Sequence, residues 1–117
     1  MSDLFAERFA AVRARFAAKL DSRIDEIETA MEEFTRDRAA ETLARAHRRA
    51  HDLCGVGPTM GFVATGSAAR AIEQVMLAAI KANRPLSDDE FEKVTNGLIA
   101  LRSAASAEAG IHTASQE

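Results

Sequence analysis

The chain has 117 residues, of which 47% are hydrophobic and 28% charged, a balance typical of one soluble globular domain. Its net charge of −3 disfavours general binding to nucleic acids, and no apolar run approaches the ~20 residues that span a membrane. The single cysteine excludes an internal disulfide and a multi-cysteine zinc site, and the N-terminus lacks the features of a signal peptide, so we expect a cytoplasmic protein.

Abundant alanine, scattered β-branched residues and only two prolines favour an all-α domain. Short connections between the later helices predict antiparallel neighbours. We therefore predict one domain over residues 1–117, built as an antiparallel four-helix bundle with an additional N-terminal helix. In this interpretation the N-terminal helix covers residues 1–19, the bundle covers 20–106 and a flexible tail covers 107–117.

The first predicted helix has its cap at Ser2 or Asp3 and ends near Lys19. Its apolar stripe is a packing face or, alternatively, a dimerisation face. A second helix follows from about Asp21, and because no glycine or proline separates the two, they can also run on with only a kink. The first stripe comprises Leu4, Phe5, Phe9, Val12, Phe16 and Leu20, the second comprises Ile24, Ile27, Met31 and Phe34, and the acidic residues Asp25, Glu26, Glu28, Glu32 and Glu33 form a solvated face.

The third predicted helix runs from about Arg38 to Gly55, and the Gly57-Pro58-Thr59 sequence ends it. Thr59 is the expected N-cap of a fourth helix over residues 60–82. Two faces of the third helix can be separated by their spacing. Leu43, Ala46, Ala50 and Leu53 should face the core, whereas Ala44, His47, Arg48, His51 and Gly55 form a different stripe.

The fifth predicted helix follows a turn over residues 83–86. Ser87 and Glu90 have the spacing of a capping box, with Ser87 as N-cap and Glu90 at the third helical position. Phe91, Val94, Leu98 and Leu101 supply the apolar face, Gly97 marks close helix packing, and the helix ends near Ala105.

His51 is the most informative residue for function. Gly55 lies one helical turn later on the same face, where a side chain would cover the imidazole, because helical side chains lean toward the N-terminus. Glycine inside a helix costs about 1 kcal/mol relative to alanine, so local stability does not explain it. We expect something large to approach the ring. Since the chain has no glycine-rich phosphate loop, it has no evident nucleotide site of its own, and a nucleophilic histidine here fits a carrier better than a complete enzyme.

The segment from His51 to Glu73 resembles the core motif of the histidine-containing phosphotransfer (HPt) domains. That motif reads His-x-Leu-Lys-Gly, then a second glycine ten residues after the histidine, then an apolar residue followed by an acid or amide. Leu53, Gly55, Gly61 and the pair Ile72-Glu73 match it. The family's lysine, which helps to neutralise the phosphoryl group, is Cys54 here, and Arg48, Arg49 or Arg70 could compensate in part.

The resemblance implies a stand-alone relay protein. His51 would accept a phosphoryl group from the aspartate of a response-regulator receiver domain and pass it to another receiver, while Glu73 would orient the imidazole. The receiver would supply Mg²⁺, so the chain needs no cofactor of its own; a hybrid histidine kinase is a further possible partner. The residues expected to face the phosphate or receiver are Arg48, Cys54, Gly55 and Arg70, those expected to contact the partner are Ala44, His47, Pro58, Met60 and Phe62, and Arg45, Arg48 and Arg49 would steer an acidic partner.

Two other functions remain open from the sequence. One is a helical adaptor or dimerisation protein that keeps the bundle without the chemistry. The other is a small metal-binding bundle, because His47 and His51 form an i, i+4 pair; this site would need a third ligand such as Glu73.

Overall fold

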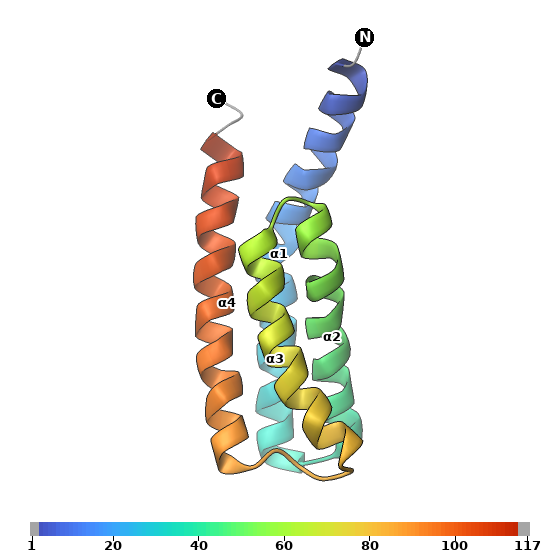
Figure 1. Cartoon of the computed structure of the whole chain (residues 1–117), viewed down its shortest axis with the longest axis vertical. Helices are drawn as coiled ribbons and strands as arrows, with labels where there is room; N and C mark the ends of the chain where they lie inside the picture. Colours follow the sequence, from blue (N-terminus) through green and yellow to red (C-terminus); the bar gives the residue numbers. More distant parts are fainter. Residues whose placement is uncertain (1–2, 115–117) are drawn as a thin grey trace.

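The computed structural model describes residues 3–114, which form four helices and no strand. The helices are α1 (Asp3–Asp37), α2 (Ala40–Thr59), α3 (Val63–Lys81) and α4 (Asp88–Ala114). Each helix runs antiparallel to the next, so the chain goes up and down through a single bundle (Figure 1). None of these helices combines the length and apolarity needed to span a membrane.

The predicted additional N-terminal helix is wrong as a separate element. Residues on both sides of the expected boundary near Lys19 belong to α1, which is 35 residues long. The helix continues because no glycine or proline interrupts it and because Phe16, Leu20 and Ile24 form one continuous buried face. Asp3 is the first helical residue, while Ser2 lies outside the described residues.

The N-terminal part of α1 projects beyond the turn between α2 and α3 (Figure 1). The apolar stripe is therefore a packing face only from Phe16 onward. Leu4, Phe5 and Val12 remain exposed at 56%, 76% and 39%. The alternative that this stripe serves dimerisation stays a prediction.

The hydrophobic core runs along the centre of the bundle and draws on all four helices. The predicted inward face of the third helix is confirmed, since Leu43, Ala46, Ala50 and Leu53 are all buried on α2. Gly97 of α4 lies against α3 as predicted: a Cβ at this position would come 2.7 Å from Ile72 Cγ1. The largest fully buried side chains are Phe34, Phe62, Leu20, Ile24, Ile27, Leu43, Leu53, Ile72, Met76, Leu101 and Val94.

The end of α2 differs from the prediction, because the helix continues through Pro58 to Thr59. Proline inside a helix removes one backbone hydrogen bond and crowds the carbonyl four residues earlier, here that of Cys54, but the bonds that close this end of α2 come from the residues after Thr59. The true stop is Gly61, whose φ of 84° lies in the left-handed region that glycine adopts without strain. The amides of Gly61 and Phe62 donate to the carbonyls of Pro58 and Gly57, at 3.0 and 2.8 Å, which completes a Schellman motif. Thr59 therefore ends α2 and does not cap α3.

The N-terminus of α3 is capped by a residue from α4. The carboxylate of Glu108 accepts hydrogen bonds from the amides of Ala64 and Thr65, at 3.0 and 2.7 Å, and from the Thr65 hydroxyl at 2.6 Å. This contact requires α4 to extend well past the predicted end near Ala105, and the helix reaches Ala114. Residues 107–114 of the expected flexible tail are thus helical, and 115–117 lie outside the described residues.

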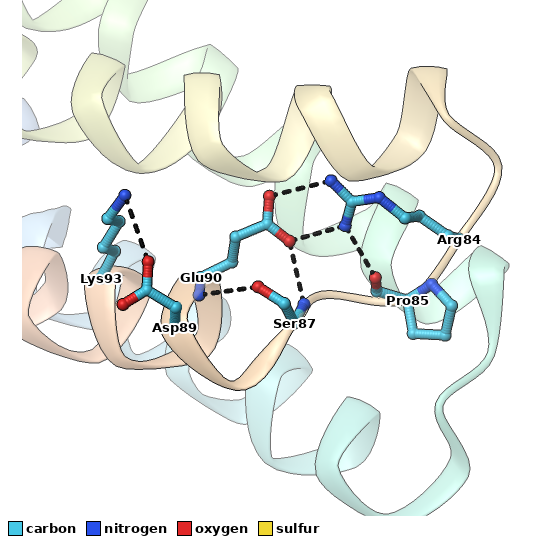
Figure 2. Close-up of polar contacts among 6 residues, drawn as sticks. All are labelled: Arg84, Pro85, Ser87, Asp89, Glu90 and Lys93. Atoms are coloured by element: carbon cyan, nitrogen blue, oxygen red, sulfur yellow. Dashed lines mark hydrogen bonds and ion pairs between the residues drawn. The ribbon is translucent and has the colours of Figure 1, made fainter.

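The start of α4 confirms the predicted capping box (Figure 2). The Ser87 amide donates to Glu90 Oε1 at 2.9 Å, and the Glu90 amide donates to Ser87 Oγ at 3.1 Å. Arg84 adds two hydrogen bonds to the same carboxylate, at 2.6 and 3.1 Å. The Arg84 guanidinium and the Ser87 amide lower the pKa of Glu90 to about 2.

The acidic face of α1 is only partly a solvated surface. Several of its carboxylates tie α1 to neighbouring helices, which the sequence did not reveal. The ion pairs are Arg102 of α4 with Asp25 and Glu28, each at 2.7 Å, and Arg45 and Arg49 of α2 with Glu33 and Glu26, at 2.7 and 3.4 Å.

Candidate functional site

The candidate site is formed by His51 of α2 and Glu73 of α3. Their side chains meet across the helix interface, with His51 Nδ1 2.9 Å from Glu73 Oε1. The side chain of His51 is 66% exposed, whereas that of Glu73 is 12% exposed. A carboxylate only accepts hydrogen bonds, so this contact assigns the proton of the neutral imidazole to Nδ1. The lone pair then lies on Nε2, which is available to an incoming group.

Two glycines shape the surroundings of this pair. A Cβ at Gly55 would meet nothing within 4 Å, so no part of the described chain occupies the space one turn after His51. Gly66 of α3 has the opposite environment, since a Cβ there would come 2.6 Å from Pro58 Cδ of α2. This close approach holds α2 and α3 together near the site. The first glycine leaves His51 open, and the second brings its partner helix close.

The hydrogen bond shifts the pKa of both partners. The Glu73 hydrogen bond and charge raise the pKa of His51 above 6.5. Burial by itself raises the pKa of Glu73, but the hydrogen bond and charge of His51 outweigh burial, and the result is a pKa below 4.5. Glu73 is therefore ionised at neutral pH and favours a proton on the imidazole.

His47 and Cys54 also lie beside the Glu73 carboxylate. His47 Nε2 is 3.6 Å from Glu73 Oε1, and its ring stacks against that of His51 with centroids 6.0 Å apart. This nitrogen is buried and has no hydrogen-bond partner within the described residues. Burial and the Glu73 carboxylate raise the pKa of the Cys54 thiol, while Arg70 acts in the opposite direction. The thiol is thus neutral and does not replace the positive charge of a lysine.

The arginines near the site fall into two groups. Arg45 and Arg49 are held in ion pairs with α1. Arg48 and Arg70 are exposed, and Arg48 borders an open hollow of about 390 Å³ together with His47, His51 and Asp52. Arg48 therefore lies on the same surface as the imidazole, whereas Arg70 of α3 is close enough to act through its charge on the Cys54 thiol.

The expected partner-binding residues are only partly at the surface. Phe62 is wrong as a contact residue, because it is fully buried and packs edge-on against Phe16 with ring centroids 5.2 Å apart. Pro58 is exposed and Met60 half-buried, both at the end of α2. Ala44 is half-buried and borders a different hollow, near the α3–α4 connection. The sequence places Phe62 in the fourth predicted helix, but α3 begins only at Val63, and Phe62 lies in the connection between α2 and α3, where it packs against the distant Phe16.

The metal-binding alternative lacks support. Within the part of the chain that the structure describes, no group of three or more His, Cys, Asp or Glu side chains has an arrangement that could hold a metal ion. The contact between His51 and Glu73 is instead a direct hydrogen bond.

Comparison with known proteins identifies the family. The family model of the Hpt domain matches residues 11–104, which is most of the chain, and the chain belongs to this family. Hpt domains are helical bundles that take part in phosphotransfer in two-component signalling, where they interact with receiver domains and kinases. No curated protein and no solved structure matches the chain significantly.

Proposed function

We propose that this protein is a stand-alone cytoplasmic phosphocarrier that relays a phosphoryl group between the aspartates of response-regulator receiver domains. His51 is the acceptor. The observation that carries the proposal is the hydrogen bond from His51 Nδ1 to Glu73, which leaves Nε2 as the nucleophilic nitrogen of an exposed ring. The open space beyond Gly55 supports it further, because a receiver has to bring its phosphorylated aspartate within bonding distance.

The transfer of the phosphoryl group to His51 requires no proton to leave the site. The Nε2 lone pair of His51 attacks phosphorus and forms the N–P bond. The P–O bond to the receiver's aspartate breaks, and the carboxylate leaves with the electron pair. The imidazole then carries a positive charge, which the ionised Glu73 stabilises through the Nδ1–H bond. The same steps in reverse pass the group to a second receiver, so Glu73 serves both directions.

In this proposal the receiver domain supplies most of the charge that neutralises the phosphoryl group. Phosphoryl transfer depends mainly on alignment and on neutralising charge, and in this proposal the receiver brings the Mg²⁺ ion. The chain itself then needs no cofactor. Arg48 and Arg70 are the exposed cations that would face the phosphoryl group in place of the lysine that Cys54 replaces. Pro58 and Met60 would contact the receiver beside His51, while Phe62 is excluded by its burial.

The test is phosphate incorporation from a phosphorylated receiver domain into the wild-type protein and into His51→Gln. We expect acid-labile, base-stable phosphate on the wild type and none on the variant, with equal helicity and thermal stability by circular dichroism. Equal labelling of both proteins would move the acceptor away from His51. A receiver that binds the wild type without any phosphate exchange would instead identify a non-catalytic adaptor.

A further inference from the structure

One carboxylate oxygen is shared between two histidines of α2. Glu73 Oε1 lies 2.9 Å from His51 Nδ1 and 3.6 Å from His47 Nε2. The first distance is a hydrogen bond and the second is slightly too long for one. His47 Nε2 is nevertheless buried and lacks a hydrogen-bond partner among the described residues. A small movement of Glu73 toward α2 would satisfy this nitrogen.

A buried N–H group without a hydrogen-bond partner is unfavourable, so a hydrogen bond to the nearest acceptor would lower the free energy. Here that acceptor is the oxygen that binds the functional imidazole. Because both ring nitrogens lie within 3.6 Å of this oxygen, the carboxylate can serve either one without a rearrangement of the helices. A carboxylate that is drawn toward one donor binds the other less tightly.

We infer that His47 is a positioning residue, which holds the Glu73 carboxylate through Nε2 and limits how strongly that carboxylate binds the Nδ1–H of His51. The inference rests on the proposed function for its effect on transfer. Glu73 alone would favour protonation of His51, and a ring protonated on both nitrogens has no lone pair for attack. By drawing the Glu73 carboxylate partly away, His47 makes protonation of His51 less favourable. A larger fraction of His51 then stays neutral and nucleophilic at neutral pH.

Other charged groups face the same region and have to be held constant in any test. On α2, Arg45, Arg48, Arg49 and Asp52 border the hollow that His47 and His51 line. On α1, Glu33 and Glu26 pair with Arg45 and Arg49. On α3, Glu73 is the group in contact. The Cys54 thiol of α2 also hydrogen-bonds the Glu73 carboxylate, and the charge of Arg70 on α3 acts on that thiol. A variant of His47 leaves all of these in place and so isolates the shared carboxylate.

The experiment is an NMR titration of the His51 imidazole in the wild type, in His47→Phe and in His47→Gln. Phenylalanine keeps a ring beside His51 but donates no hydrogen bond, whereas glutamine keeps a donor. We expect the pKa of His51 to rise by about half a pH unit in His47→Phe, about a threefold change in the ratio of neutral to protonated ring. We expect His47→Gln to restore most of the wild-type value. An unchanged pKa of His51 in His47→Phe would overturn the inference.

A second pair of variants tests whether the effect passes through Glu73. In a Glu73→Gln background the carboxylate is absent, so His47→Phe should no longer shift the pKa of His51. A shift of the same size in that background would overturn the inference, because His47 would then act directly on the ring.

The titration needs no phosphorylated partner, so it is independent of the proposed function. If the wild type takes up no phosphate on His51, the proposed function fails while the titration can still succeed. If the wild type takes up phosphate, the pH at which uptake is half-maximal should rise by the same half unit in His47→Phe. If the pKa of His51 rises in His47→Phe but the pH profile of phosphate uptake stays the same, His47 does not affect transfer, and that part of the inference is contradicted.

Discussion

Gly66 of α3 lies directly against the ring of Pro58 in α2, so closely that a Cβ at position 66 would come 2.6 Å from Cδ and 2.8 Å from Cγ of the proline. A proline ring is not the mobile end of a long side chain and cannot move aside cheaply. This contact therefore sets the separation of the two helices that carry His51 and Glu73.

We predict that Gly66→Ala destabilises the protein and weakens the site. Overpacking of this kind costs about 1–3 kcal/mol, which exceeds the gain of about 1 kcal/mol from replacing glycine in a helix. The two helices would be pushed apart, and the hydrogen bond of 2.9 Å between His51 and Glu73 would lengthen. Urea unfolding measures the first effect and phosphate uptake measures the second. A variant as stable and as active as the wild type would contradict the close contact.

We predict the opposite effect on stability for Gly55→Ala, which adds the same methyl group at a glycine with open space around it. Because nothing lies within 4 Å of a Cβ at this position, the substitution should stabilise α2, by up to about 1 kcal/mol. The added methyl group would project into the open space one turn after His51, more than 4 Å from the ring, and if the receiver approaches through that space the rate of phosphate uptake should fall severalfold. Stability and transfer should thus change in opposite directions. Unchanged transfer kinetics would show that the space beyond His51 is not used.

The pH dependence of transfer should follow the charge of Glu73. Since Glu73 raises the pKa of His51, uptake in the wild type should increase with pH as His51 loses its second proton. Glu73→Gln keeps an acceptor for Nδ1 but removes the charge, so the pKa of His51 should fall toward 6.5 and the profile should move to lower pH. Glu73→Ala should instead lower the rate at every pH, because it removes the acceptor. Identical profiles for the wild type and Glu73→Gln would rule out this role.

Stability at acidic pH should depend on Glu90. The folded-state pKa of about 2 lies below the ordinary value of 4.5, so the contribution of Glu90 is present above pH 4.5 and is lost as the pH falls toward 2. Glu90→Gln should lower the free energy of unfolding at pH 6 by about 1 kcal/mol, with a smaller difference from the wild type at pH 2. Urea unfolding at both pH values measures this.

Asp89→Asn is the control for that comparison. Asp89 is in the same turn, but its side chain is 78% exposed and pairs with Lys93 at 3.4 Å (Figure 2). Exposed ion pairs of this kind contribute about 0–1 kcal/mol, so this variant should unfold almost like the wild type at both pH values. Because glutamine keeps the capping box, an equal loss in the two variants would assign the effect to negative charge at the helix start in general rather than to the contact of Glu90 with Arg84.

Local sequence signals were sufficient for the inward faces of the helices and for the start of α4. Leu43, Ala46, Ala50 and Leu53 follow a spacing that determines which side of α2 is buried, and Ser87 and Glu90 satisfy each other within one turn. Both patterns depend only on residues a few positions apart. The Glu73 contact with His51 was expected only from the resemblance to a family.

The errors occurred where contacts between distant segments decide the outcome. Local signals predict a stop at Pro58, but this residue lies in the last turn of α2 and packs against Gly66. They predict an end of α4 near Ala105, but the helix runs on and places Glu108 where it caps α3 across 43 residues of sequence. They do not reveal that Phe62 packs against Phe16, which is far away in the chain.

The sequence by itself determined that this chain forms amphipathic helices and that His51 lies on an outward face with a glycine one turn later, because helical periodicity is a local property. Only the tertiary structure decided that α1 is one helix, that Gly66 brings α3 against α2 and that a single oxygen of Glu73 lies between His51 and His47. Periodicity specifies the direction in which a side chain points, whereas the distance between side chains on different helices depends on how closely those helices pack.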